Sequence, residues 1–193
     1  MSTQTPVLEI ACQQVMADDA SVFSVQWADL PESMAGALSP RDLLARYLSY
    51  ISRCTLTLIR PVTGESGIEF RLFCTGLSLI SFLPPDHEGC FATLRICGGY
   101  LVQSHQCDRG ELRFGIEPAS GAVRVSLQLS DFCPLILGGS APSRFRFWLY
   151  RVTQAAIHRL VTVRFLALLY HELAGRSAGV KIITVAVRSG KPV

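Results

Sequence analysis

Polar and apolar residues alternate strictly in the stretch "CDRGELRFGIEPASGAVRVSLQLSDFCP", residues 107–134. Leu112, Phe114 and Ile116 alternate with charged residues and a glycine. After the turn sequence "PASG", a second run alternates in the same way, with apolar residues at Val123, Val125, Leu127 and Leu129. A period of two is typical of a strand that buries one face. The stretch therefore predicts a β-hairpin with charges gathered at one end.

Further strands are predicted before this hairpin. Residues 21–30 alternate between polar and apolar positions, and segments 55–61 and 66–74 flank the turn sequence "VTGE". Residues 90–106 read as two strands joined by a Gly-Gly bend. Consecutive strands with short connections predict an antiparallel sheet with one buried face and one outward face.

A short amphipathic helix is predicted between the first strand and the rest of the sheet. Ser39 is a suitable N-cap and Pro40 fits the first helical position. Apolar residues then recur at helical spacing over 43–51.

A much longer helix is predicted after the hairpin. From Ser143 to about Ala174 the chain contains neither glycine nor proline, and Gly175 is a natural stop. Unbroken, this helix would be roughly 45 Å long. Its apolar residues recur at steps of three and four and form one seam: Phe145, Leu149, Val152, Ala156, Leu160, Val163, Ala167 and Tyr170. Four residues fall on a more polar stripe: Arg144, Arg151, His158 and Thr162. A closing strand follows at 180–187.

Composition supports a folded chain with much apolar surface to bury. The 193 residues suit one domain, which we expect to span 1–193. Hydrophobic residues make up 49% and charged residues 17%, which excludes a disordered chain. Such a chain either buries a large core or surrounds an apolar cavity or partner surface.

Charge and cysteine usage narrow the classes of partner. The net charge is +3 and the arginines are scattered, so we expect no nucleic-acid partner. Seven cysteines, an odd number without a C-x-x-C pair, indicate reduced thiols. No signal peptide and no long uncharged apolar run are recognisable, which predicts a cytoplasmic protein without stable membrane insertion.

The order strand, helix, several strands, long helix resembles that of the helix-grip proteins. This superfamily contains the steroidogenic-regulatory lipid-transfer (START) domains and the birch-pollen-allergen-like proteins. The resemblance implies an α+β fold, in which a curved antiparallel sheet wraps one long C-terminal helix and a short helix precedes the sheet. It also implies a ligand cavity between the sheet and the long helix.

The hairpin and long helix also resemble an uncharacterised bacterial and plant family, known only as a domain of unknown function. In that family a hairpin of the form L-P-G-H-P-E-x-G-E-E-x-F precedes a second strand, S-x-P and an arginine-bearing helix. The likeness covers roughly residues 90–174, and Val102-Gln103 and S-D-F-C-P depart from the motif. It implies a fold and a cavity but no reaction. The matching positions are Leu101, His105, Arg109, Gly110, Glu111, Arg113, Phe114, Val123, Val125, Ser130 and Pro134.

From the expected cavity we predict a set of ligand-binding residues. At its mouth, His105, Glu111 and Arg113 would orient a polar head group. Its apolar wall would be formed by Phe114, Leu127, Trp148, Val152 and Ala156. Two alternatives stay open: Glu111 and Arg113 would form an exposed pair of little energy, and the aromatic and arginine residues that open the long helix would pack in the core or meet a membrane surface.

The sequence offers little for catalysis. His158 and His171 lie too far apart on the long helix to share a metal, and no phosphate loop or nucleophile elbow occurs. Cys107 lies near His105, but no third group orients them. We therefore predict no catalytic residue, metal or cofactor.

Three functions fit this interpretation. We favour a non-catalytic protein that binds an apolar or amphipathic, lipid-like small molecule between the sheet and the long helix. One alternative is a homo-oligomeric interaction protein, such as a homodimer, whose interface is the long apolar helix. The other is a cyclase- or hydrolase-type enzyme built on the same cavity, which would need a buried ionisable pair.

Overall fold

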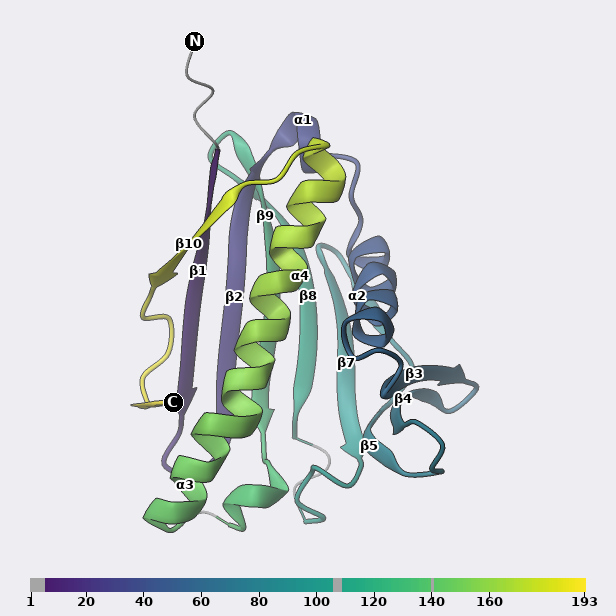
Figure 1. The fold of residues 1–193 in the computed structure, drawn as a ribbon, viewed down its shortest axis with the longest axis vertical. Coiled ribbons are helices and arrows are strands. Elements are labelled where there is room, and N and C mark those ends of the chain that lie inside the picture. Colours follow the sequence, from purple (N-terminus) through teal and green to yellow (C-terminus); the bar gives the residue numbers. More distant parts are fainter. Residues whose placement is uncertain (1–5, 106–108, 140) are drawn as a thin grey trace.

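The computed structural model describes residues 6–105, 109–139 and 141–193. A large curved sheet of eleven strands forms one layer, and a long helical segment lies across its front (Figure 1). The strands follow the order β10-β1-β2-β9-β8-β7-β5-β4-β3, with β11 beside β1 and β6 beside β7. The predicted α+β fold, a curved antiparallel sheet gripping one long C-terminal helix with a short helix before it, is confirmed.

The strands are β1 (Val7–Met16), β2 (Val22–Pro31), β3 (Ile59–Gly64), β4 (Gly67–Leu72), β5 (Ser78–Phe82), β6 (Asp86–Glu88), β7 (Phe91–Gly98), β8 (Glu111–Ala119), β9 (Ala122–Phe132), β10 (Gly179–Thr184) and β11 (Lys191–Pro192). The helices are α1 (Glu32–Ala35), α2 (Pro40–Cys54), α3 (Arg144–Tyr150) and α4 (Ala156–Ala174). A π turn (Arg151–Ala155) joins α3 to α4, and a 3₁₀ turn (Leu135–Leu137) follows β9.

The predicted short helix forms as α2, and its start is fixed by a capping box. The Ser39 hydroxyl accepts a hydrogen bond from the Asp42 amide at 3.1 Å, and the Ser39 amide donates to the Asp42 carboxylate at 3.3 Å. Pro40 occupies the first turn, where no amide donor is needed. The helix buries one face, which includes Leu43 and Tyr47.

The predicted hairpin forms as β8 and β9, in register from Glu111↔Ser130 to Ala119↔Ala122. The predicted first strand forms as β2 and pairs with β9. Phe114 and Leu127 face the helices and are completely buried. The ring of Phe114 lies 5.2 Å from that of Tyr47, which in turn lies 5.2 Å from that of Phe165 on α4. Aromatic and aliphatic side chains therefore fill this part of the sheet–helix interior.

Two strands at the ends of the chain form an edge that the sequence only partly predicts. The N-terminal strand β1 is not predicted, because Gln13 and Gln14 interrupt its apolar alternation. The predicted closing strand forms as β10 and pairs with β1 in parallel, from Val7↔Gly179 to Cys12↔Thr184. This is a parallel pair at the edge of an otherwise antiparallel sheet.

Two other predicted strands are shorter or missing. Residues 55–58 form a turn, in which Leu56 and Thr57 adopt positive φ angles, so β3 begins only at Ile59. The strand predicted after the Gly-Gly bend does not form, and Val102 makes a single bridge with Pro134. Gly99 has a φ of +119°, and a Cβ there would lie 2.5 Å from the Cα of Ile80. Position 99 of the bend therefore has no room for a side chain, and only glycine fits there.

The long helix differs from its prediction in register. The π turn inserts an extra residue, which rotates the faces of α3 and α4 relative to one regular helix. Val163 and Tyr170 of the predicted seam are buried, whereas Phe145, Val152 and Leu160 are exposed. In a further correction, Thr162 of the predicted polar stripe is completely buried, and its hydroxyl donates to the His158 carbonyl at 2.9 Å.

Candidate functional site

The structure does not bring the eight predicted ligand-binding residues together. Phe114 and Leu127 lie in the core, beneath α2 and α4. Glu111 and Arg113 alternate with the inward residues of β8 and lie on the opposite face of the sheet. His105 is exposed in the loop after the Gly-Gly bend. Cys107, considered with His105 as a nucleophile, lies outside the described residues.

Glu111 and Arg113 form the ion pair that the sequence left open as an alternative, and both side chains are half-buried. The Arg113 guanidinium donates to the Glu111 carboxylate at 2.9 Å and also lies over the ring of Phe91, 5.2 Å from its centroid. Both side chains are partly accessible to water, where such a pair contributes little to stability.

The three predicted residues of the long helix point away from the core. Trp148 is exposed and stacks on Phe145, with 6.3 Å between the ring centroids. Val152 and Ala156 are exposed as well, because the π turn shifts the buried face of the helix. Of the eight residues, Ala156 is the one that lines the groove described next.

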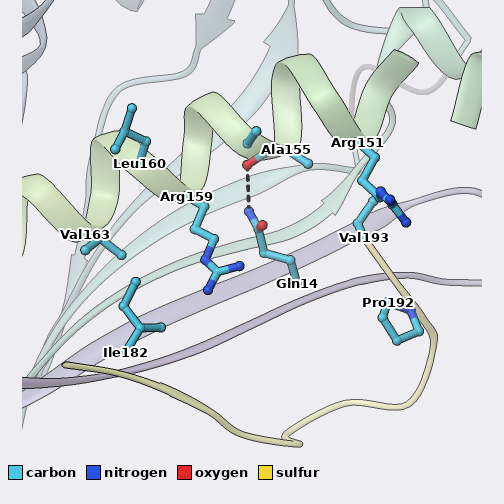
Figure 2. Close-up of a pocket in the computed structure, with 10 residues that line it drawn as sticks. Gln14, Arg151, Ala155, Arg159, Leu160, Val163, Ile182, Pro192 and Val193 are labelled. Atoms are coloured by element: carbon cyan, nitrogen blue, oxygen red, sulfur yellow. Dashed lines mark hydrogen bonds between the residues drawn. The ribbon is translucent and has the colours of Figure 1, made fainter. Parts of the chain in front are cut away.

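A groove of about 440 Å³ lies between the long helix and the edge of the sheet formed by β1, β10 and β11 (Figure 2). The helix supplies one wall, β1 the floor, and β10 and β11 the opposite wall. The lining residues are Gln14, Arg151, Ala155, Ala156, Arg159, Leu160, Val163, Ile182, Pro192 and Val193.

Hydrogen bonds from two consecutive glutamines of β1 hold both walls. The Gln14 side chain donates to the Ala155 carbonyl of the π turn at 3.2 Å. Gln13 binds the segment between β10 and β11, because its side-chain oxygen accepts from the amides of Val187 and Arg188 at 2.8 and 2.9 Å. Its side-chain nitrogen donates to the Arg188 carbonyl at 2.6 Å. Side-chain hydrogen bonds from β1 therefore fix the position of both walls of the groove.

Two arginines give the groove its charge. Arg151 and Arg159 lie two turns apart on one side of the helix, and Figure 2 shows both side chains reaching from the helix towards β1 and β11. Neither forms an ion pair within the described part of the chain. The wall around them is aliphatic. The groove therefore offers guanidinium donors beside an apolar surface.

Several of the charged groups that line other hollows are already paired. One of about 610 Å³ is lined by Glu9 and Asp29, which bind Lys181 at 2.7 Å and Arg124 at 2.7 Å. One of about 680 Å³ is lined by Arg113, which binds Glu111. A third, of about 550 Å³, adjoins the groove and shares Arg159 with it. The groove differs from these hollows in having two arginines, Arg151 and Arg159, without an ion pair in the described chain.

The described residues contain no group of three or more histidine, cysteine or acidic side chains that could hold a metal. His158 is partly buried on α4, and this burial lowers the pKa of its imidazole to about 4. The side chain is therefore neutral at physiological pH. It does not line the groove.

Comparisons with known proteins give only distant structural similarities. No family model and no curated protein matches the sequence. The solution NMR structure of CalU16 from Micromonospora echinospora is similar at 13% identity, with 93% of this chain and 80% of that chain covered and a TM-score of 0.39.

Two crystal structures are similar to a comparable degree. Protein Ms6760 from Mycobacterium smegmatis has 10% identity, coverages of 85% of this chain and 98% of that chain, and a TM-score of 0.41. The crystal structure of CalU16 has 12% identity, coverages of 87% and 96%, and a TM-score of 0.30. The helix-grip-like description therefore rests on the chain's own sheet and helix.

Sequence reasoning missed most of the groove. Arg151 was placed on the polar stripe of the helix, but Arg159, Gln14 and Ile182 were not singled out. The useful signal was the Gln13-Gln14 pair, which interrupts an otherwise apolar alternation in β1. Buried or half-buried amides in a strand need partners, and these lie at the two walls of the groove.

Proposed function

We propose that this protein binds a small amphipathic molecule, with an anionic head and an apolar tail, in the groove beside the long helix. The single observation that carries the proposal is the presence of Arg151 and Arg159, without carboxylate partners in the described chain, beside an aliphatic wall. The lipid-like ligand class predicted from the sequence is kept. The proposed site lies at the edge of the sheet and not beside Phe114 and Leu127, which pack in the core.

An anionic head group is the partner that these residues favour. A guanidinium presents a planar fork of donors that matches carboxylates and phosphates. Leu160, Val163 and Ile182 offer an apolar surface to a hydrocarbon tail. A volume of about 440 Å³ lies within the range of small-molecule sites, which begins at about 300 Å³.

Binding is favoured over catalysis by the chemistry of the lining. The polar side chains there are one amide and two guanidinium groups, and no lining side chain carries a carboxylate, imidazole, thiol or hydroxyl group. General acid–base or nucleophilic chemistry needs such groups within reach of the substrate. The cyclase or hydrolase alternative therefore has less support here.

The proposal also covers the superfamily to which the protein belongs and its location in the cell. We propose membership of the START and birch-pollen-allergen-like superfamily, supported by the order strand, helices, strands and long helix. The family of unknown function with the hairpin motif belongs to the same proposal. A cytoplasmic location is proposed on the sequence features given above.

The test compares two ligands of equal chain length, decanoate and decanol, by isothermal titration calorimetry below their aggregation limits. Arg151→Gln combined with Arg159→Gln should weaken decanoate binding about tenfold, or ~1.4 kcal/mol, and leave decanol binding unchanged. Arg41→Gln with Arg176→Gln, two exposed arginines elsewhere, is the matched control. Saturable decanoate binding that survives the first pair, or no binding at all, would contradict the proposal.

A second variant tests the apolar wall. Ala156→Trp places a large ring in the groove from an exposed position on the helix, so the fold should tolerate it. Both ligands should then bind at least tenfold more weakly. Ala45→Trp, on the exposed face of α2, should change neither affinity.

A further inference from the structure

An exposed apolar row runs along the long helix. It consists of Phe145, Trp148, Val152, Ile157 and Leu160, here called the outer stripe, whose members are between 44% and 67% exposed. Their spacing of three, four, five and three residues is helical once the extra residue of the π turn is counted. The stripe is roughly 22 Å long at 1.5 Å per residue.

Nothing described in the chain covers this side of the helix. Figure 1 shows α3 and α4 in front of the sheet, with no other element in front of them. The helical segment Arg144–Ala174 is long and apolar enough, by length and composition alone, to cross a membrane. In its most apolar window, only 33% of the residues are buried. Exposed apolar patches of this kind mark interaction sites.

The charged side chains beside the stripe are all positive. Five exposed arginines lie on the same helical segment (Arg144, Arg146, Arg151, Arg159 and Arg164), and residues 143–171 contain no aspartate or glutamate. None of the five forms an ion pair with another described residue. The partner of the stripe must therefore offer negative charge together with an apolar layer.

We propose that the outer stripe docks the protein on the surface of an anionic lipid bilayer, with the helix lying in the membrane interface. Aromatic and aliphatic residues enter the boundary of the acyl region, while arginines reach the head groups. The helix lies on the bilayer and does not cross it, because its opposite face packs on the sheet through Phe165, Leu166 and Leu169.

A second copy of the chain fits the same surface less well. In a two-fold dimer the same patch meets itself, so the arginines beside the stripe in one copy would approach those of the other. No carboxylate between 143 and 171 would compensate them. A bilayer that contains phosphatidylglycerol supplies the missing charge. Leu160, Arg151 and Arg159 also line the groove. The variants that test the stripe therefore replace residues outside the groove lining.

The test is co-sedimentation of the full chain with vesicles of two compositions. One is phosphatidylcholine alone, and the other is two parts phosphatidylcholine to one part phosphatidylglycerol. Binding should be roughly tenfold or more stronger to the anionic vesicles and should weaken with added salt. In a Trp27→Phe background, the fluorescence of Trp148 should shift to the blue on binding, because this ring enters the interface.

Matched variants assign the binding to the stripe. Trp148→Ser with Ile157→Ser should abolish binding to anionic vesicles, whereas Leu56→Ser with Leu58→Ser should not. These four side chains are all more than half exposed, so neither pair should disturb folding. Arg144→Gln with Arg146→Gln should weaken binding several-fold. Decanoate affinity should be unchanged in every one of these variants, which separates a failure here from a failure of the groove.

Several outcomes would overturn the proposal. Equal binding to both vesicle compositions would remove the role of the arginines. Binding that persists in the Trp148/Ile157 variant would place the contact elsewhere. The protein could also fail to bind vesicles and form a dimer in light scattering. If Trp148→Ser with Ile157→Ser then dissociated that dimer, the partner of the stripe would be a second copy of the chain.

Discussion

The Gln14 side-chain amide donates a hydrogen bond to the Ala155 carbonyl at 3.2 Å, across residues 141 positions apart in the sequence. This bond ties β1 at the edge of the sheet to the π turn of the long helix. A π turn is a local irregularity in the helical hydrogen-bond ladder, and such turns are frequent at functional sites. Here it stands at the wall of the groove.

Replacing Gln14 by leucine should lower the free energy of unfolding by about 0.5–1.5 kcal/mol, because a partly buried carbonyl loses its side-chain donor. Urea denaturation followed by circular dichroism measures this change. Ser120→Ala, in the exposed turn between β8 and β9, should stay within about 0.5 kcal/mol of the unaltered chain. Equal effects in the two variants would show that the contact has no role in stability.

Phe114 and Leu127 should behave as core residues and not as ligand contacts. Phe114→Ala should cost about 3–5 kcal/mol and Leu127→Ala about 2–5 kcal/mol, because each leaves a cavity in the filled interior. Decanoate affinity of the folded fraction should be unchanged in both. A small loss of stability together with a large loss of decanoate affinity would show that the ligand binds in the sheet–helix interior.

The capping box of α2 should contribute measurably to stability. Ser39→Ala removes the acceptor for the Asp42 amide and should cost about 0.5–2 kcal/mol in urea denaturation. Ser49→Ala lies on the exposed face of the same helix and should be neutral or slightly stabilising, since alanine has the higher helix propensity. If both substitutions had the same effect, the box would contribute nothing beyond propensity.

Stability should fall in mildly acidic solution because of His158. Its folded-state pKa of about 4 lies below the unfolded value of about 6.5, so the unfolded chain binds more protons between these values. Stability is therefore lost as the pH falls from about 6.5 to about 4, by roughly 1–3 kcal/mol for this partly buried ring. The urea midpoint measured across this window tests the expectation.

Two variants separate His158 from other groups in that window. His158→Gln should flatten the dependence, and His87→Gln, at an exposed position on β6, should leave it unchanged. Hydrogen bonds from Ser21 and Arg109 hold the pKa of the Asp19 carboxyl far below its usual value. The stability from Asp19 is therefore lost only at pH values below about 4. An unchanged slope in His158→Gln would contradict this assignment.

The sequence predicted the elements whose pattern is local. Strict alternation located β2, β8 and β9, and Ser39-Pro40 located the start of α2. Residues 55–58 were misassigned, because a turn with positive φ at Leu56 and Thr57 has no local signal in a run of threonine and leucine. The π turn escaped prediction for a similar reason, since an inserted residue changes the buried face without breaking the apolar pattern.

The candidate site was harder to predict than the fold, because it is assembled from distant segments. Gln14 and Ile182 meet the helix only after β10 pairs in parallel with β1, and no local pattern specifies that pairing. The charges of the hairpin favoured Glu111 and Arg113 as ligand-binding residues, but the period of two places both on the face opposite the buried residues of β8. The alternation in the sequence was therefore enough to predict that these two side chains do not face the core.

The most direct test of ligand binding in the groove is a methyl NMR titration with decanoate. Chain labelled at the isoleucine, leucine and valine methyl groups reports on the groove through Leu160, Val163 and Ile182, and on the sheet–helix interior through Leu112 and Leu127. We predict saturable shifts at the three groove residues, with the interior methyl groups unchanged. Saturable shifts at Leu112 and Leu127, with the groove methyl groups unchanged, would contradict the proposed site.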